Sequence, residues 1–127
     1  MNEPALTAVK LQTSNLSACE SFFGTVFGFE VIHRYGGKPG DAFEEIVMTL
    51  GGRKGQMLKF IQLCDRSNVA TGATIQIAGI NVDEAVVAAT AAHATVIMEA
   101  KDYVDAGVRM AVISTDQGVA VELVQTL

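Results

Sequence analysis

Four side chains of this chain could carry acid–base chemistry on a small molecule: Glu122, Lys10, His33 and Tyr35. A carboxylate held between apolar neighbours could remove a proton as a general base, and a lysine could stabilise the negative oxygen that results. Histidine exchanges protons near neutral pH, and tyrosine can donate from its phenol. Three of them have structural alternatives. Glu122 could form an ion pair with Lys10, Lys10 could bend into solvent, and His33 could be a hydrogen-bonded residue in the wall of a pocket.

The elements that would position these groups occur twice in the sequence. Residues 6–32 read as strand, helix and strand, and residues 74–97 read the same way. Asn15 and Asn81 would cap the two helices, which sets the offset between the halves at 66 residues. Gly28 would end the first helix, and His93 follows the second helix at nearly the same place. This duplication predicts a site where the halves meet.

The remaining strands complete two βαβββ modules of an α+β fold. Module one covers about residues 5–64 and module two about residues 73–126, and together they are expected to form a single domain of 127 residues. Strands are expected near residues 42–50, 56–63, 95–99, 108–114 and 119–125. Residues 36–41 and 101–107 are expected to be loops, and the second of these could close over a ligand.

Composition excludes several classes of partner. The net charge is -5, and the nine Lys and Arg residues are scattered, so nucleic acid is not expected to bind. No apolar run approaches the roughly 20 residues that span a bilayer, and the first residues do not resemble a signal peptide. We therefore expect a soluble cytoplasmic protein. Cys19 and Cys64 lie in no CxxC motif and are expected to be reduced thiols.

Two motifs resemble those of the vicinal oxygen chelate superfamily, which includes glyoxalase I, bleomycin-resistance proteins and extradiol dioxygenases. The run NLSACESFF from Asn15 to Phe23, followed by VFGFEV from Val26 to Val31, is similar to the family's first helix and second strand. The run TDQGVAVELVQ from Thr115 to Gln125 is similar to the family's last hairpin. The resemblance implies two βαβββ modules that form a curved mixed sheet around a pocket.

Metal-dependent members of this superfamily place a ligand on the first and last strands of each module. Carried over to this chain, those positions are Ala8, Gln62, Thr74 and Glu122. Only Glu122 is a normal strong ligand, whereas a catalytic divalent cation usually takes about three from His and carboxylate. We therefore expect no metal and no other cofactor.

The resemblance also predicts which strand residues face the pocket. Lys10, Glu122, His33 and Tyr35 are the candidate catalytic groups. The candidate ligand-binding residues are Gln12, Leu58, Phe60, Gln62, Thr74, Gln76, Met110 and Val112. Of Glu44 and Glu45, at most one can face inward, because strand side chains alternate.

These residues favour a metal-independent enzyme of lyase or isomerase type, with Glu122 as general base on a carbonyl-containing or aromatic compound. Lys10, His33 or Tyr35 would stabilise the oxyanion. The first alternative is a binding protein that sequesters a small molecule, as bleomycin-resistance proteins do. The second alternative is a metal-dependent glyoxalase-like lyase or dioxygenase. By analogy with the superfamily, we expect a homodimer.

Overall fold

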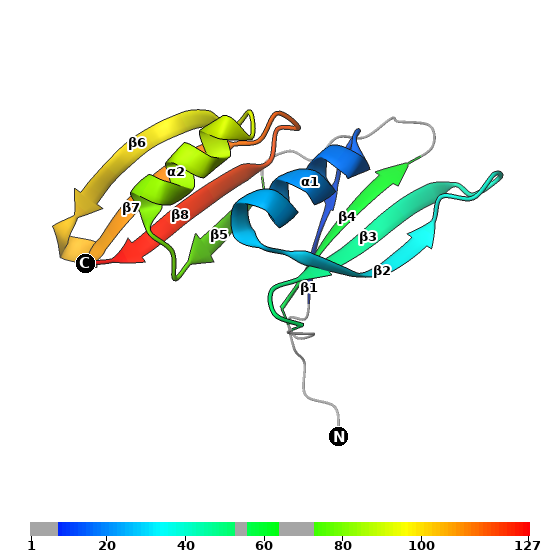
Figure 1. The fold of residues 1–127 in the computed structure, drawn as a ribbon, viewed down its shortest axis with the longest axis horizontal. Coiled ribbons are helices and arrows are strands. Elements are labelled where there is room, and N and C mark those ends of the chain that lie inside the picture. Colours follow the sequence, from blue (N-terminus) through cyan, green and yellow to red (C-terminus); the bar gives the residue numbers. More distant parts are fainter. Residues whose placement is uncertain (1–7, 53–55, 64–72) are drawn as a thin grey trace, which may run out of the picture. The chain divides into compact units, whose positions relative to one another are not determined.

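The structure is a computed structural model, and it describes residues 8–52, 56–63 and 73–127. The chain divides into two compact units, unit 1 (Met1–Val69) and unit 2 (Ala70–Leu127), and each is described by itself. Each unit has the order strand, helix and three strands (Figure 1). The prediction of two βαβββ modules in an α+β fold is confirmed, and each module forms its own four-stranded mixed sheet.

Unit 1 builds its sheet in the order β1-β4-β3-β2. Its elements are β1 (Ala8–Gln12), α1 (Leu16–Phe27), β2 (Glu30–Gly36), β3 (Phe43–Thr49) and β4 (Met57–Leu63). β1 runs parallel to β4, and the other neighbours are antiparallel. α1 packs on β3 and β4, so it covers one face of this sheet (Figure 1).

Unit 2 repeats this topology in the order β5-β8-β7-β6. Its elements are β5 (Thr74–Ala78), α2 (Val82–Ala91), β6 (Thr95–Tyr103), the 3-10 helix η1 (Val104–Ala106), β7 (Val108–Ser114) and β8 (Ala120–Thr126). The predicted loop at residues 101–107 is wrong in its first part, because residues 101–103 pair with β7. α2 packs on β6, β7 and β8.

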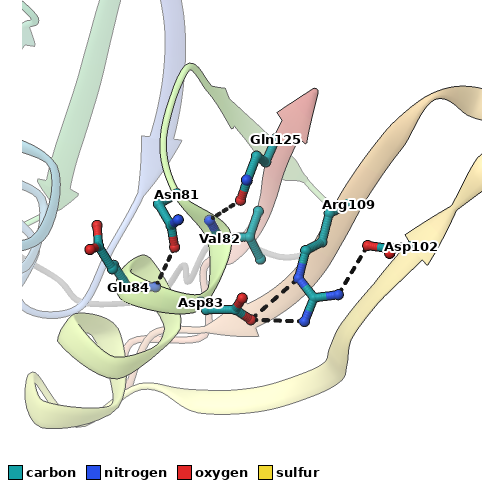
Figure 2. A network of polar contacts seen from close by, with 7 residues as sticks. All are labelled: Asn81, Val82, Asp83, Glu84, Asp102, Arg109 and Gln125. Atoms are coloured by element: carbon teal, nitrogen blue, oxygen red, sulfur yellow. Dashed lines mark hydrogen bonds and ion pairs between the residues drawn. The ribbon is translucent and has the colours of Figure 1, made fainter. Parts of the chain in front are cut away.

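Each helix begins at the asparagine that the sequence indicates. Asn15 Oδ1 accepts a hydrogen bond from the amide of Ala18 at 3.0 Å. Asn81 Oδ1 accepts one from the amide of Glu84 at 2.9 Å (Figure 2). These bonds satisfy amides that have no partner within the helix itself, so they fix where each helix starts.

A glutamine from the last strand of each unit supplies a second acceptor at the helix start. Gln62 Oε1 accepts from the amide of Leu16 at 2.8 Å in unit 1. Gln125 Oε1 accepts from the amide of Val82 at 2.8 Å in unit 2, as Figure 2 shows. Each glutamine therefore ties the first turn of its helix to the strand that closes its unit.

The two helices end on different residues in the same backbone conformation. Gly28 caps α1 with φ 80°, and His93 follows α2 with φ 74°. A left-handed conformation costs a residue with a side chain more than it costs glycine. His93 therefore occupies the place that glycine fills in unit 1, as the sequence suggested.

Ion pairs join each helix to its sheet. Arg34 on β2 binds Glu20 on α1 through two bonds of 2.8 and 2.6 Å. The hydrogen bond from Arg34 lowers the pKa of the Glu20 carboxyl below its ordinary value, against a smaller opposing effect of burial. In unit 2, Arg109 lies between Asp83 and Asp102 (Figure 2), and these bonds raise the pKa of its guanidinium.

The cores under the helices differ in their side chains. Phe23 of α1 is fully buried, and its ring lies 5.2 Å from the ring of Phe60 on β4. Cys19 is also buried there, and its thiol donates to Thr13 Oγ1 at 3.3 Å. Cys64 lies outside the described residues. α2 buries Val82 and Ala89 instead.

Within the described part of the chain, no helix is long and apolar enough to cross a membrane.

Candidate functional site

Each sheet has one face under its helix and one face that no helix of the same unit covers, which we call the helix-free face. Phe60 and Arg34 mark the covered face of unit 1, because both contact α1. Side chains alternate along a strand, so the residues next to them point the other way. In unit 2, Arg109 and Gln125 mark the covered face in the same way, because both contact α2.

Four residues of unit 1 are directly paired across the helix-free face, and we call them the unit 1 row. The unit 1 row is Lys10, Lys59, Val47 and His33. The next paired set along the same face is Gln12, Ile61, Glu45 and Tyr35.

The contacts within this face are specific. Lys10 Nζ lies 2.9 Å from Glu45 Oε1, and Glu45 is only 6% exposed. The rings of His33 and Tyr35 are stacked, with centroids 5.6 Å apart and planes inclined by 26°. Tyr35 is 47% exposed, so this stack presents aromatic surface to solvent beside an ion pair.

The helix-free face of unit 2 has a corresponding row. The unit 2 row is Gln76, Glu122, Val112 and Met98. Thr74 and Met110 lie on the same face by alternation, as expected from the sequence. Glu122 is half-buried, and no ion pair to it occurs among the described residues.

The strand registers of the two units match residue by residue. The equivalent pairs are Lys10 with Gln76, Lys59 with Glu122, Val47 with Val112, and His33 with Met98. The polar groups at equivalent places therefore differ in charge, with a lysine in unit 1 where unit 2 has a glutamate.

The predicted orientation of β4 is wrong. Leu58 and Phe60 are buried on the covered face, and Gln62 binds the first turn of α1, so none of the three faces away from the helix. Packing decides this orientation, because Phe60 fills the space beneath Phe23. The helix-free side of β4 presents Lys59 and Ile61 instead.

The sequence does contain the signal that would have corrected this error. LKFIQ from Leu58 to Gln62 aligns with VELVQ from Val121 to Gln125, which places glutamine on glutamine and Lys59 on Glu122. Sequence reasoning instead paired Gln62 with Glu122 and so missed Lys59. It also left open which of Glu44 and Glu45 faces the site, and the structure places Glu45 there.

The other predicted residues lie on the helix-free faces of their own units. Lys10, Gln12, His33 and Tyr35 do so in unit 1. Thr74, Gln76, Met110, Val112 and Glu122 do so in unit 2. Within unit 1, Lys10 binds Glu45, and the ion pair expected between Lys10 and Glu122 stays a prediction. The roles of these residues in binding or catalysis stay predictions.

The residues at the superfamily's metal positions do not fit a divalent cation. With Lys59 replacing Gln62 as the equivalent of Glu122, the four positions hold Ala8, Lys59, Thr74 and Glu122. One carboxylate and one hydroxyl do not make the usual set of about three strong ligands, and an ammonium group repels the ion. In residues 8–52, 56–63 and 73–127, no three His, Cys, Asp or Glu side chains cluster as a metal site would require.

Two hollows open elsewhere on unit 1, and they share Glu44 and Gln62. The larger, of about 580 Å³, is lined by the hairpin loop of residues 37–41. The smaller, of about 320 Å³, lies beside the start of α1 and is lined by Glu20 and Arg34. Neither contains an aromatic side chain or a residue predicted to be catalytic.

Known structures share this architecture at low sequence identity. A glyoxalase I variant from Zea mays superposes with a TM-score of 0.82 at 15% identity over 94% of this chain. This chain spans only 45% of the length of that maize protein. A glyoxalase family protein from Bacillus cereus gives a TM-score of 0.81 at 16% identity, covering 100% of this chain and 97% of that protein.

An antibiotic-binding protein from a Streptomyces species is also similar. Its TM-score is 0.74 at 15% identity, with 100% of this chain and 99% of that protein covered. Identities this low identify the fold alone. No protein-family sequence profile matches the chain. No curated protein sequence matches it either.

Proposed function

We propose that this chain, which has the vicinal oxygen chelate fold, is a binding protein that holds a planar aromatic small molecule and releases it unchanged. The observation that carries this proposal is the exposed stack of His33 and Tyr35 on the helix-free face of unit 1. Aromatic rings supply most of the contact area in small-molecule sites, and a few polar groups orient the ligand.

The state of Lys10 favours binding over turnover. A lysine that stabilises an oxyanion must direct its charge at the substrate, whereas Lys10 is already bound to Glu45 at 2.9 Å. The antibiotic-binding protein of the same fold and nearly the same length is a precedent for a non-catalytic use of this scaffold.

The proposal is tested by titrating the chain with an anthracycline and a naphthoquinone and following ligand absorbance and fluorescence. After overnight incubation, the ligand is extracted and its mass is measured. We expect saturable binding and an unchanged mass. A product of different mass would overturn the proposal.

Tyr35→Ala should weaken binding by about threefold to tenfold, the effect of losing one aromatic contact. Tyr103→Ala is the matched control, because it removes the only other tyrosine of the chain, which lies on β6 in unit 2. Equal losses in the two variants would contradict a site at the His33–Tyr35 stack.

A metal-independent lyase or isomerase is the second candidate, favoured by Glu122. This carboxylate lies on the helix-free face between Gln76 and Val112, with no ion pair among the described residues. Its proposed role is to take a proton from the carbon next to a carbonyl. The enolate formed is then reprotonated in an isomerase, or it expels a leaving group in a lyase.

Proton exchange tests this second candidate directly. A panel of ketones and aldehydes in heavy water is followed by NMR for loss of the proton next to the carbonyl. Glu122→Gln should slow enzyme-dependent exchange by about 10²- to 10⁴-fold, because it removes the base. Exchange no faster than in buffer, or equal in both proteins, would reject Glu122 as a base.

We also propose a homodimer in the cytoplasm. Both sheets end in edge strands, β1 and β2 in unit 1 and β5 and β6 in unit 2, and pairing of copies would protect such edges. Light scattering at working concentration checks the dimer, and a monomeric mass would contradict it.

A further inference from the structure

Two lysines lie side by side on the helix-free face of unit 1. Lys10 on β1 is the direct register partner of Lys59 on β4. Neighbouring strands lie about 4.8 Å apart, and like charges directly opposite each other destabilise a sheet. This arrangement therefore calls for negative charge nearby.

Glu45 supplies that charge to only one of the two. Its carboxylate lies 2.9 Å from Lys10 Nζ and is almost fully buried. Lys59 is half-buried and has no ion pair among the residues the structure describes. Among residues 8–52, 56–63 and 73–127, the centre of this face thus has one ammonium group without an ion pair, in a chain whose net charge is -5.

The comparison with unit 2 shows that this charge is not a requirement of the fold. Glu122 occupies the equivalent register position, and its row neighbour Gln76 is neutral. The pair of lysines is therefore a feature of unit 1 alone.

We propose that the molecule bound by unit 1 is a planar aromatic anion, with its carboxylate held by Lys59 and its rings on the His33–Tyr35 stack. This inference rests on the binding function proposed above and names the chemical class of the ligand. Lys59 and His33 belong to the same row with Val47 between them, so their strands lie about 10 Å apart. A two-ring aromatic acid spans that distance.

The test compares 2-naphthoate with 2-naphthamide, which has the same rings but no charge. Each is titrated into isotope-labelled protein, and amide chemical shifts report both affinity and location. We expect 2-naphthoate to bind more tightly, with the largest shifts in β2, β3 and β4. Its affinity should fall with added salt, whereas that of 2-naphthamide should not.

Lys59→Gln should weaken 2-naphthoate binding by about tenfold, the effect of losing one charged hydrogen bond, and leave 2-naphthamide unchanged. Lys59→Arg should retain most of the affinity. Lys38→Gln removes the same charge from the hairpin loop of unit 1 and is the matched control. It should leave the affinity for both ligands unchanged.

The outcomes separate this inference from the function on which it rests. If neither compound binds the unaltered protein, the proposed aromatic-binding site and this inference both fail. If the two bind equally, or Lys59→Gln weakens both equally, the anion inference fails while the binding function stands. If Lys59→Gln does not fold, the salt dependence of the unaltered protein decides, and equal salt dependence for both compounds overturns the inference.

Discussion

The two units share one backbone plan but fill it with different side chains. At the same helix position, unit 1 has Phe23 and unit 2 has Ala89, and both are fully buried. All six phenylalanines of the chain lie in unit 1. The ring of Phe23 contacts the rings of Phe22, Phe27, Phe29 and Phe60.

What the units keep in common is the connection between the helix start and the last strand. Gln62 and Gln125 make the same bond of 2.8 Å to the first turn of their helices. A duplicated fold can therefore preserve a polar connection while its core changes from aromatic to aliphatic. The helix-free faces differ as well, since Lys59 in unit 1 is the equivalent of Glu122 in unit 2.

The largest effect should come from exchanging the core residues of the two helices. Phe23→Ala leaves a cavity within the aromatic cluster and should lower the free energy of unfolding by about 3–5 kcal/mol. Ala89→Phe overpacks a fully buried site and should cost about 1–3 kcal/mol or more. Urea unfolding measures both, and a cost below about 1 kcal/mol for either would show that the cores are interchangeable.

A second pair of variants tests whether the glutamine connection contributes equally to stability in both units. Gln62→Ala and Gln125→Ala each leave a helix amide without its acceptor. Each should cost about 1–2 kcal/mol, comparable to the loss of a helix cap. Urea unfolding gives the two values. Unequal costs would mean that one glutamine is dispensable and that the shared geometry is not a shared requirement.

The sequence predicts the limits of the helices well because their signals are local. Asn15, Asn81 and Gly28 act on amides and carbonyls within one turn, so residue type and position are enough to identify them. His93 could be recognised by its place in the repeat, although glycine is the usual residue at a positive φ.

The faces of β4 could not be predicted from alternation. The strand has apolar residues on both sides, with Leu58 and Phe60 on one and Met57 and Ile61 on the other. Period two therefore identifies a strand without saying which side meets the helix. The packing of Phe60 on Phe23, which lies on another element, sets the orientation. In the sequence, the orientation is indicated by the alignment of LKFIQ with VELVQ rather than by alternation.

The polar contacts of the site were unpredictable for a related reason. Lys10 and Glu45 lie on β1 and β3, which are separated in the sheet by β4. No sequence spacing indicates a contact across an intervening strand. Sequence reasoning considered Glu122 as the partner of Lys10 and did not consider Glu45.

The residues that end the two helices give a third comparison. Substitutions there should change the free energy of unfolding in opposite directions in the two units. Gly28→Ala forces a side chain into a left-handed conformation and should cost about 1–2 kcal/mol. His93→Gly relieves that strain and should be neutral or stabilising by up to about 1 kcal/mol, since glycine also gains freedom in the unfolded chain. Thermal unfolding of both variants checks the signs. Destabilisation by His93→Gly would show that the histidine makes contacts that outweigh its strain.

The smallest expected effect concerns the ion pair between helix and sheet in unit 1. The bond from Arg34 lowers the pKa of Glu20 in the folded state below its ordinary value of 4.5. A lowered folded-state pKa adds stability above that value and loses it as the pH falls through the folded-state pKa. Glu20→Gln should therefore cost less than about 1 kcal/mol at neutral pH, because the pair is partly exposed, and nothing in acid.

Urea unfolding of Glu20→Gln at neutral pH and at acidic pH measures this difference. Glu30→Gln is the matched control, since Glu30 is an exposed carboxylate on β2 with no ion pair among the described residues. A cost for Glu20→Gln that stays constant into acid would mean that packing of the side chain, rather than its charge, joins α1 to β2.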